Sequence, residues 1–158
     1  MLKYLLLLTI AFCSSVAIGQ SLTNVLKIDK MAQSIDSAKN LGQTVLDGTI
    51  AQKSKSLFIK KLSGYFSETY YYNKYSKRLL RVSYYSYLKK HEYEDYYFLN
   101  DSLILVTTQI GTGTNNKYYF KEDTIFKKMG YDTLITPQYF IKKAIRYLKD
   151  FKELPFSK

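Results

Sequence analysis

The chain has 158 residues, a length that fits one domain with a modest core. It contains a single cysteine, Cys13, and a single histidine, His91. One cysteine cannot form a disulfide within the chain, and a zinc site would need mostly carboxylate ligands. The formal net charge of +11 favours acidic partners, such as lipid headgroups, acidic glycans or an acidic protein.

The first 19 residues are typical of a cleavable signal peptide. Lys3 gives a short basic start, and Tyr4–Phe12 is an apolar run. Small residues at Ala17 and Gly19 suit signal peptidase, so we expect cleavage before Gln20. Residues 1–19 are therefore set aside, and residues 20–158 are expected to form a single α+β domain.

Two alternatives to a cleaved signal are a membrane anchor and a lipoprotein. The apolar stretch Tyr4–Ile18 has 15 residues, whereas a spanning helix needs about 20. Cys13 follows an apolar run as a lipidated cysteine would, but Phe12 stands where lipoprotein processing wants a small residue. We therefore favour cleavage, with no transmembrane span left afterwards.

Cleavage would leave a chain without cysteine, and hence without a disulfide, a thiol nucleophile or a cysteine-ligated metal. A disulfide-free exported domain of this size fits the periplasm or outer surface of a Gram-negative bacterium. Loss of Lys3 lowers the net charge to +10. Export argues against nucleic acid as the partner. The lysines could instead keep an aromatic-rich surface soluble and block the pairing of strand edges.

Residues 25–46 have the pattern of an amphipathic helix. Apolar and small residues recur there at spacings of three and four: Ile28, Met31, Ile35, Ala38, Gly42 and Val45. Gly48 is a plausible end of this helix. Residues 47–63 fit either a strand or a short helix around Leu57, Phe58 and Ile59.

The middle of the chain, from Tyr65 to Phe126, holds 13 of the 17 tyrosines. Its most regular feature is a repeated phrase, because Tyr96–Ile104 returns 22 positions later as Tyr118–Phe126. In each copy three aromatic residues lead to a short polar turn that ends in Asp, followed by a small hydroxyl residue and two apolar ones. This is the pattern of a β-hairpin, used twice.

The region of about 64–128 is therefore predicted to be an antiparallel sheet. The expected strands are Tyr65–Tyr72, Arg78–Tyr87, Tyr93–Leu99, Ser102–Gln109, Lys117–Lys121 and Thr124–Lys128. The connections are short and contain no helix, which favours a meander.

Two-residue turns fix the expected pairing in both hairpins. In the first hairpin Phe98 should pair with Leu103, Tyr97 with Ile104 and Tyr96 with Leu105. In the second, Phe120 should pair with Ile125 and Tyr119 with Phe126. Phe98, Leu103, Tyr96 and Leu105 would share one face, and Tyr97, Ile104 and Val106 the other. Both faces carry apolar bulk, so we expect the helices to cover one face and the other to curl on itself or remain a tyrosine-lined surface.

Residues 137–152 are predicted to form a second amphipathic helix. Thr136 is a good N-cap, Pro137 suits the first helical position, and Ile135 and Phe140 have the spacing of a hydrophobic staple. Its apolar stripe should pack on the sheet, while a basic helix of this kind could also lie on an anionic membrane. The expected fold is thus α+β, an antiparallel meander of about six strands with an amphipathic helix at each end. Both helices are expected to pack on one face of the sheet.

No combination of residues identifies a catalytic, metal or cofactor site, and we expect none. His91, with Glu92, Glu94 and Asp95 nearby, could serve as a general base, but it lies in a polar stretch typical of a hairpin turn. Neighbouring Glu94 and Asp95 would point to opposite faces of a strand. The chain also lacks the Gly-x-Ser-x-Gly elbow of many hydrolases.

The remaining candidate for function is the tyrosine-rich sheet face. Tyrosine combines a flat apolar ring with a polar tip and is enriched in interfaces. We nominate Tyr71, Tyr85, Tyr97 and Tyr119 as ligand-binding residues of a non-enzymatic, exported protein that binds an acidic protein, glycan or lipid headgroup. The alternatives are a periplasmic carrier of lipid or another hydrophobic ligand, and a small hydrolase that uses His91.

Overall fold

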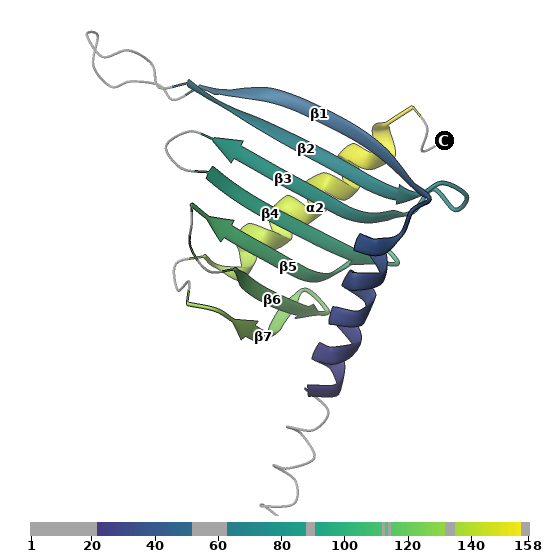
Figure 1. Cartoon of the computed structure of the whole chain (residues 1–158), viewed down its shortest axis with the longest axis vertical. Coiled ribbons are helices and arrows are strands. Elements are labelled where there is room, and N and C mark those ends of the chain that lie inside the picture. Colours follow the sequence, from purple (N-terminus) through teal and green to yellow (C-terminus); the bar gives the residue numbers. More distant parts are fainter. Residues whose placement is uncertain are drawn as a thin grey trace, which may run out of the picture.

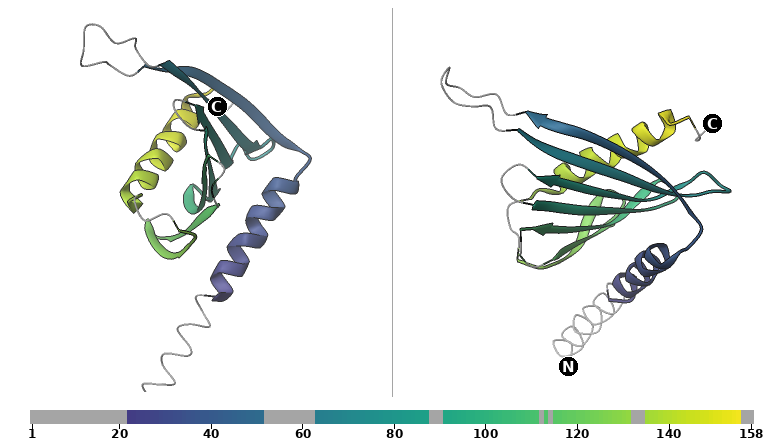
Figure 2. Two further views of the ribbon diagram at one scale, coloured as in Figure 1. Left: turned by 60° about the vertical axis from the view of Figure 1, so that its left-hand side comes forward. Right: turned by 45° about the horizontal axis from the view of Figure 1, so that its top comes forward.

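The computed structural model describes residues 22–51, 63–87, 91–111, 113, 115–131 and 135–155. They form one twisted antiparallel sheet with a helix on each side of it (Figures 1 and 2). The chain enters through a helix that covers residues 22–37 and leaves through α2, Pro137–Glu153. The predicted α+β meander with a helix at each end is confirmed.

The sheet has seven strands where about six were expected. Each strand pairs with its neighbour in sequence, from β1 to β7. The strands are β1 (Leu41–Ala51), β2 (Ser63–Asn73), β3 (Leu79–Tyr87), β4 (His91–Leu99), β5 (Ser102–Ile110), β6 (Asn116–Lys121) and β7 (Thr124–Met129).

The additional strand is β1, so the prediction of a helix over residues 25–46 is wrong in its second half. The helix ends at residue 37, and Leu41 begins a strand that pairs with β2 along its whole length. Gly42, which fits the helical spacing, and Gly48, the expected end of the helix, both lie within this strand. A Cβ at Gly42 would lie 2.2 Å from the ring of Tyr72, and one at Gly48 would lie 2.4 Å from the ring of Phe66. These glycines let aromatic rings of β2 lie across β1.

Both predicted hairpins form, each with a two-residue turn. Asn100 and Asp101 have φ angles of 50° and 62°, and Glu122 and Asp123 have 49° and 58°. Positive φ at both central positions is the signature of a type I′ turn, whose twist matches that of the flanking strands.

Beyond each turn the predicted register is wrong, because both hairpins contain a β-bulge. Phe98 pairs with Leu103 as expected, but Tyr97 pairs with Leu105, so Ile104 is the extra residue. Leu105 therefore shares a face with Tyr97, and Val106 shares one with Tyr96, the reverse of the expectation. The second hairpin repeats this irregularity at Phe126, since Tyr119 pairs with Lys127.

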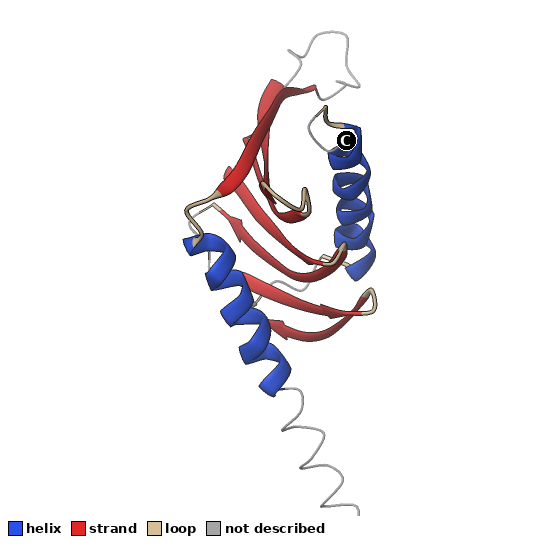
Figure 3. Ribbon diagram, turned by 90° about the vertical axis from the view of Figure 1, so that its right-hand side faces the viewer, coloured by secondary structure: helices blue, strands red, loops and turns tan. Residues whose placement is uncertain are grey.

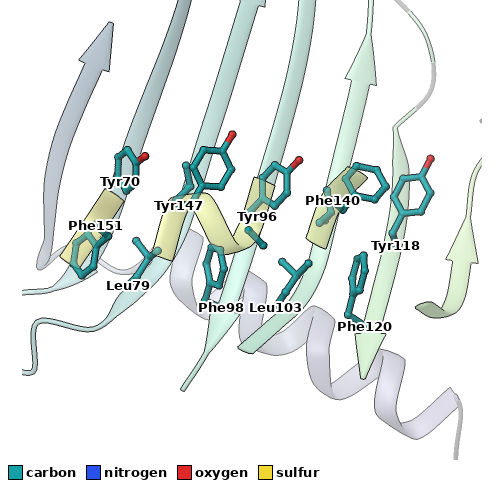
Figure 4. Close-up of a cluster of buried hydrophobic side chains, with 13 residues drawn as sticks. Tyr70, Leu79, Tyr96, Phe98, Leu103, Tyr118, Phe120, Phe140, Tyr147 and Phe151 are labelled. Carbon is teal, nitrogen blue, oxygen red and sulfur yellow. The ribbon is translucent and has the colours of Figure 1, made fainter. Parts of the chain in front are cut away.

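The larger core lies between the sheet and α2, on what we call the α2 face (Figure 4). The helix buries Phe140, Ala144, Tyr147 and Phe151. Against them pack the buried sheet residues Tyr70, Leu79, Val82, Tyr96, Phe98, Leu103, Val106, Tyr118 and Phe120. The predicted helix of 137–152 is confirmed to within one residue. Thr136 occupies the N-cap position without a side-chain capping bond, so the helix start is set mainly by Pro137.

The N-terminal helix covers part of the opposite face of the sheet, which we call the N-helix face (Figure 3). Val25 and Ala32 pack against Tyr97, Leu105 and Tyr119. The two helices therefore take opposite faces instead of sharing one, which accounts for the apolar residues on both sides of the strands.

Candidate functional site

The part of the N-helix face that lies away from the N-terminal helix carries an exposed group of rings from β2, β3 and β4. The register places Tyr65 beside Tyr87, Tyr87 beside His91, and Tyr85 beside Tyr93. Tyr65, Tyr87 and Tyr93 are 48%, 39% and 45% exposed, His91 is exposed and Tyr85 is half-buried. We call these five residues the aromatic patch. It lies where β3 ends and β4 begins, at the other end of these strands from the helix (Figure 1).

Tyr85 is the centre of the aromatic patch. Its ring centroid lies 4.8 Å from that of Tyr93 and 5.6 Å from that of Tyr65, while Tyr87 and His91 are 4.7 Å apart. The Tyr85 hydroxyl is 3.0 Å from the Tyr65 hydroxyl and 2.6 Å from Nδ1 of His91. The bond with Tyr65 is the main reason that the pKa of Tyr85 is raised to about 12. These contacts hold the rings of the aromatic patch against one another.

The four tyrosines nominated from the sequence occupy different places. Tyr85 belongs to the aromatic patch. Tyr71 is half-buried on the same face, with the guanidinium carbon of Arg81 4.1 Å from its ring centroid. Tyr97 and Tyr119 lie beneath the N-terminal helix and are only 5% and 0% exposed. The structure thus brings together rings that sequence reasoning did not group.

Tyr97 and Tyr119 are docking points for the N-terminal helix. The Tyr97 hydroxyl donates to Asp36 at 3.1 Å, and Arg81 forms an ion pair with the same carboxylate at 2.5 Å. One heptad earlier, Asp29 repeats this arrangement. It accepts from the Tyr119 hydroxyl at 3.0 Å and pairs with a neighbouring lysine of β6 at 2.8 Å. Burial, together with these carboxylates, raises the pKa of both phenols.

The α2 face contains a cleft of about 660 Å³ beside α2. We call it the α2 cleft. The sheet lines it with Phe66, Glu68 and Tyr84, and α2 lines it with Tyr139, Lys142, Lys143 and Arg146.

Two buried glutamates fasten α2 to the sheet along this cleft. Glu94 accepts hydrogen bonds from Tyr96 at 2.7 Å, Tyr139 at 2.9 Å and Lys143 at 2.6 Å. Burial lowers the pKa of Lys143, an effect that the charge of Glu94 opposes. Glu68, two strands away, accepts from Tyr70 and forms an ion pair with Arg146. Each buried carboxylate thus has a cation from α2 as its partner.

His91 is the first residue of β4, so it belongs to a strand and not to the predicted turn. Its ring takes part in the aromatic patch. Alternation along β4 places the side chains of Glu92 and Glu94 on the face opposite to that of His91. Glu94 and Asp95 therefore point to opposite faces, as expected. Asp95 bonds instead to Ser83 at 2.5 Å.

Within the described residues, no group of three or more His, Cys, Asp or Glu side chains is placed to hold a metal ion. In the same part of the chain, neither helix combines the length and the apolar character needed to cross a bilayer.

The sequence signal for the aromatic patch was present but incomplete. Tyr85 and Tyr87 have the same parity within one predicted strand, which predicts a shared face. Tyr93 joins them through the register of β3 with β4, which pairs it with Tyr85. The contribution of Tyr65 depends on the register between β2 and β3, which the sequence pattern did not fix.

Comparisons of this chain with protein-family models, with curated proteins and with solved structures find no match.

Proposed function

We propose that this chain is an exported, non-enzymatic binding protein that holds its ligand on the aromatic patch. The observation that carries the proposal is the contact network of five residues whose rings lie together on the part of the N-helix face that the N-terminal helix leaves uncovered. They are Tyr65, Tyr85, Tyr87, His91 and Tyr93. Clustered exposed rings on a protein surface are a common mark of an interaction site.

The chemistry of the aromatic patch suits a partner with both flat apolar and polar surface. Tyrosine rings offer contact area at little cost in side-chain entropy, and their hydroxyls add hydrogen bonds. Because the hydroxyl of Tyr85 is already bonded to Tyr65 and His91, part of the ordering is complete before binding. The net charge of +10 that remains after cleavage before Gln20 adds attraction to an acidic protein, glycan or lipid headgroup.

We prefer this proposal to a lipid carrier because a cluster of buried aromatic and aliphatic side chains lies between α2 and the sheet, where a carrier would need an interior cavity (Figure 4). His91, the residue on which a hydrolase would depend, has its Nδ1 bonded to a tyrosine hydroxyl of the patch. In our proposal it serves as one of the polar groups that meet the ligand.

Export rests on the pattern of residues 1–19 and has its own test. Expression from the full sequence in a Gram-negative host should yield a periplasmic or secreted protein whose intact mass begins at Gln20. Recovery of the protein in the cytoplasm with its first residues present would contradict export.

The binding proposal is tested with a double variant, Tyr87→Ala with Tyr93→Ala. Both residues are well exposed, so the variant should fold, which circular dichroism would check. The matched control is Tyr75→Ala, which removes a ring that is 92% exposed in the β2–β3 turn, outside the patch.

Each protein is immobilised and exposed to envelope extract, to purified lipopolysaccharide and to an acidic polysaccharide, at low and high salt. We expect a bound partner that the control retains, that the double variant loses and that high salt weakens. Equal binding by the double variant and the control would overturn the proposal.

A further inference from the structure

We propose that the α2 cleft is a second binding site, and that it takes a small organic anion made of one acidic group and one flat ring. The site is independent of the aromatic patch because it lies on the other face of the sheet. Its volume of about 660 Å³ falls within the range of small-molecule sites.

We assign an acidic group to the ligand because the charged side chains that line the cleft differ in how deeply they are buried. The side chain of Glu68 is only 4% exposed, whereas that of Arg146 is 46% exposed. Lys142, which also lines the cleft, is exposed as well. The Glu68 carboxylate thus lies at the base of the cleft, and the exposed cations Lys142 and Arg146 lie at its mouth, so an entering ligand meets positive charge first.

Arg146 is held in place for such a ligand. Its Nη2 bonds to Glu68, and its Nε is 3.9 Å from Asp150 on the next turn of α2. A guanidinium has five N–H donors in a fixed plane, so donors beyond those used remain for a carboxylate or phosphate oxygen. Lys142 lies four residues before Arg146 on the same side of the helix and can reach the same anion.

The flat ring is assigned from the aromatic floor of the cleft. The rings of Phe66 and Tyr84 lie nearly parallel, 26° apart with centroids separated by 6.4 Å. The Phe66 ring is seated over Gly48, and the Lys143 ammonium stands 3.7 Å from the centroid of Tyr84. A rigid apolar floor below exposed cations suits a ligand that pairs a ring with an acid.

The test uses two anions that combine an acidic group with a ring, benzoate with a flat ring and D-glucuronate with a puckered sugar ring. Their neutral counterparts are benzyl alcohol and D-glucose. Binding is followed by amide chemical shifts in NMR titrations of the protein expressed from its full sequence. We expect at least one anion to bind at millimolar concentration, with shifts centred on residues 66–68, 84 and 142–146. The neutral counterpart should bind roughly tenfold more weakly, since it lacks a charge-assisted hydrogen bond.

Two variants examine the assigned cations. Lys142→Gln removes an exposed charge, and Arg146→Lys keeps the ion pair with Glu68 while losing the planar donors. Each should weaken anion binding roughly tenfold. Lys149→Gln, an exposed lysine of α2 that does not line the cleft, is the control and should change affinity less than about twofold. Tyr87→Ala should also bind the anion normally, which separates this site from the aromatic patch.

Binding of either anion with this dependence on Lys142 and Arg146 supports the site and shows whether a sugar or an aromatic ring is preferred. The proposal is overturned if neither anion binds, if the neutral compounds bind equally well, or if the shifts centre on the N-helix face.

Discussion

The hydroxyl of Tyr97 donates to both carboxylate oxygens of Asp36, at 3.2 Å and 3.1 Å, and so joins the middle of the sheet to the last turn of the N-terminal helix. The same pairing recurs between Asp29 and Tyr119, at 3.0 Å and 3.2 Å. Two acids one heptad apart thus meet two tyrosines two strands apart. A helix with few buried apolar residues obtains a defined position from this pair of polar contacts.

Asp36→Asn should loosen the N-terminal helix. The substitution removes the charge that pairs with Arg81 and weakens the acceptor of Tyr97. Because the Asp36 side chain is 43% exposed, solvent screens the interaction, and we expect a loss of about 1 kcal/mol in the free energy of unfolding. Hydrogen exchange should be faster in residues 22–37 and unchanged in α2. Asp47→Asn, on exposed β1, is the control, and equal effects of the two substitutions would contradict this role of Asp36.

Alkaline pH should unfold the protein as buried phenols ionise. Burial is the main cause that raises the pKa of Tyr70, Tyr96, Tyr97, Tyr119, Tyr139 and Tyr147. Because these pKa values are higher in the folded than in the unfolded chain, their contribution to stability is complete below about pH 10 and declines as pH rises further. Tyrosinate absorbance should therefore rise in two stages, the second together with loss of the circular dichroism signal. A single stage near the ordinary tyrosine pKa, with the fold intact, would count against this arrangement.

Glu94→Gln should be strongly destabilising. The substitution leaves Lys143 with a buried ammonium and no counter-charge, and it gives Tyr96 and Tyr139 a weaker acceptor. Removing one partner of a buried ion pair costs about 3–5 kcal/mol, which urea denaturation would measure.

Two further variants test this explanation. Glu153→Gln, at the exposed end of α2, should change stability by less than about 0.5 kcal/mol. Adding Lys143→Met to Glu94→Gln should recover part of the loss, because the unpaired charge is then gone. If the double variant is no more stable than Glu94→Gln alone, the loss does not arise from the buried charge.

Glu122→Gly should stabilise the β6–β7 hairpin. Glu122 has a φ of 49°, a conformation that costs a residue with a Cβ roughly 1–2 kcal/mol and that glycine adopts freely. Glycine also makes the unfolded chain more flexible, so we expect a net gain of about 0.5 kcal/mol in thermal or urea unfolding. Glu122→Ala, which removes the same side chain without glycine's freedom, should bring no such gain. A gain of equal size in both variants would assign the effect to the side chain instead.

The parts of the fold that sequence analysis predicted correctly are those encoded locally. The turn Asn100-Asp101 and its counterpart Glu122-Asp123 gave the hairpins, and the start of α2 was evident from Thr136 and Pro137. The strand β1 was missed because its glycines and apolar residues also satisfy a helical spacing. Only the partner strand distinguishes the two, through the rings of Phe66 and Tyr72 that lie over Gly48 and Gly42.

The candidate sites were harder to predict because they depend on register. One bulge at Ile104 exchanges the faces of Leu105 and Val106. The residue types around Ile104 do not predict this bulge. The four nominated tyrosines, Tyr71, Tyr85, Tyr97 and Tyr119, lie on one face of the sheet. That the N-terminal helix covers that face near Tyr97, and leaves it open near Tyr85, follows from tertiary contacts that alternation does not encode.

The order of the strands in the sheet also determines how this protein reaches its native state. Because every strand pairs with the next strand in sequence, each pairing closes a short loop and loses little chain entropy. Such low contact order favours rapid folding compared with sandwiches, in which strands distant in sequence must find each other. The hairpins with type I′ turns, β4–β5 and β6–β7, are natural starting points. The sheet can then grow outward from them one strand at a time, with β1 joining at its edge.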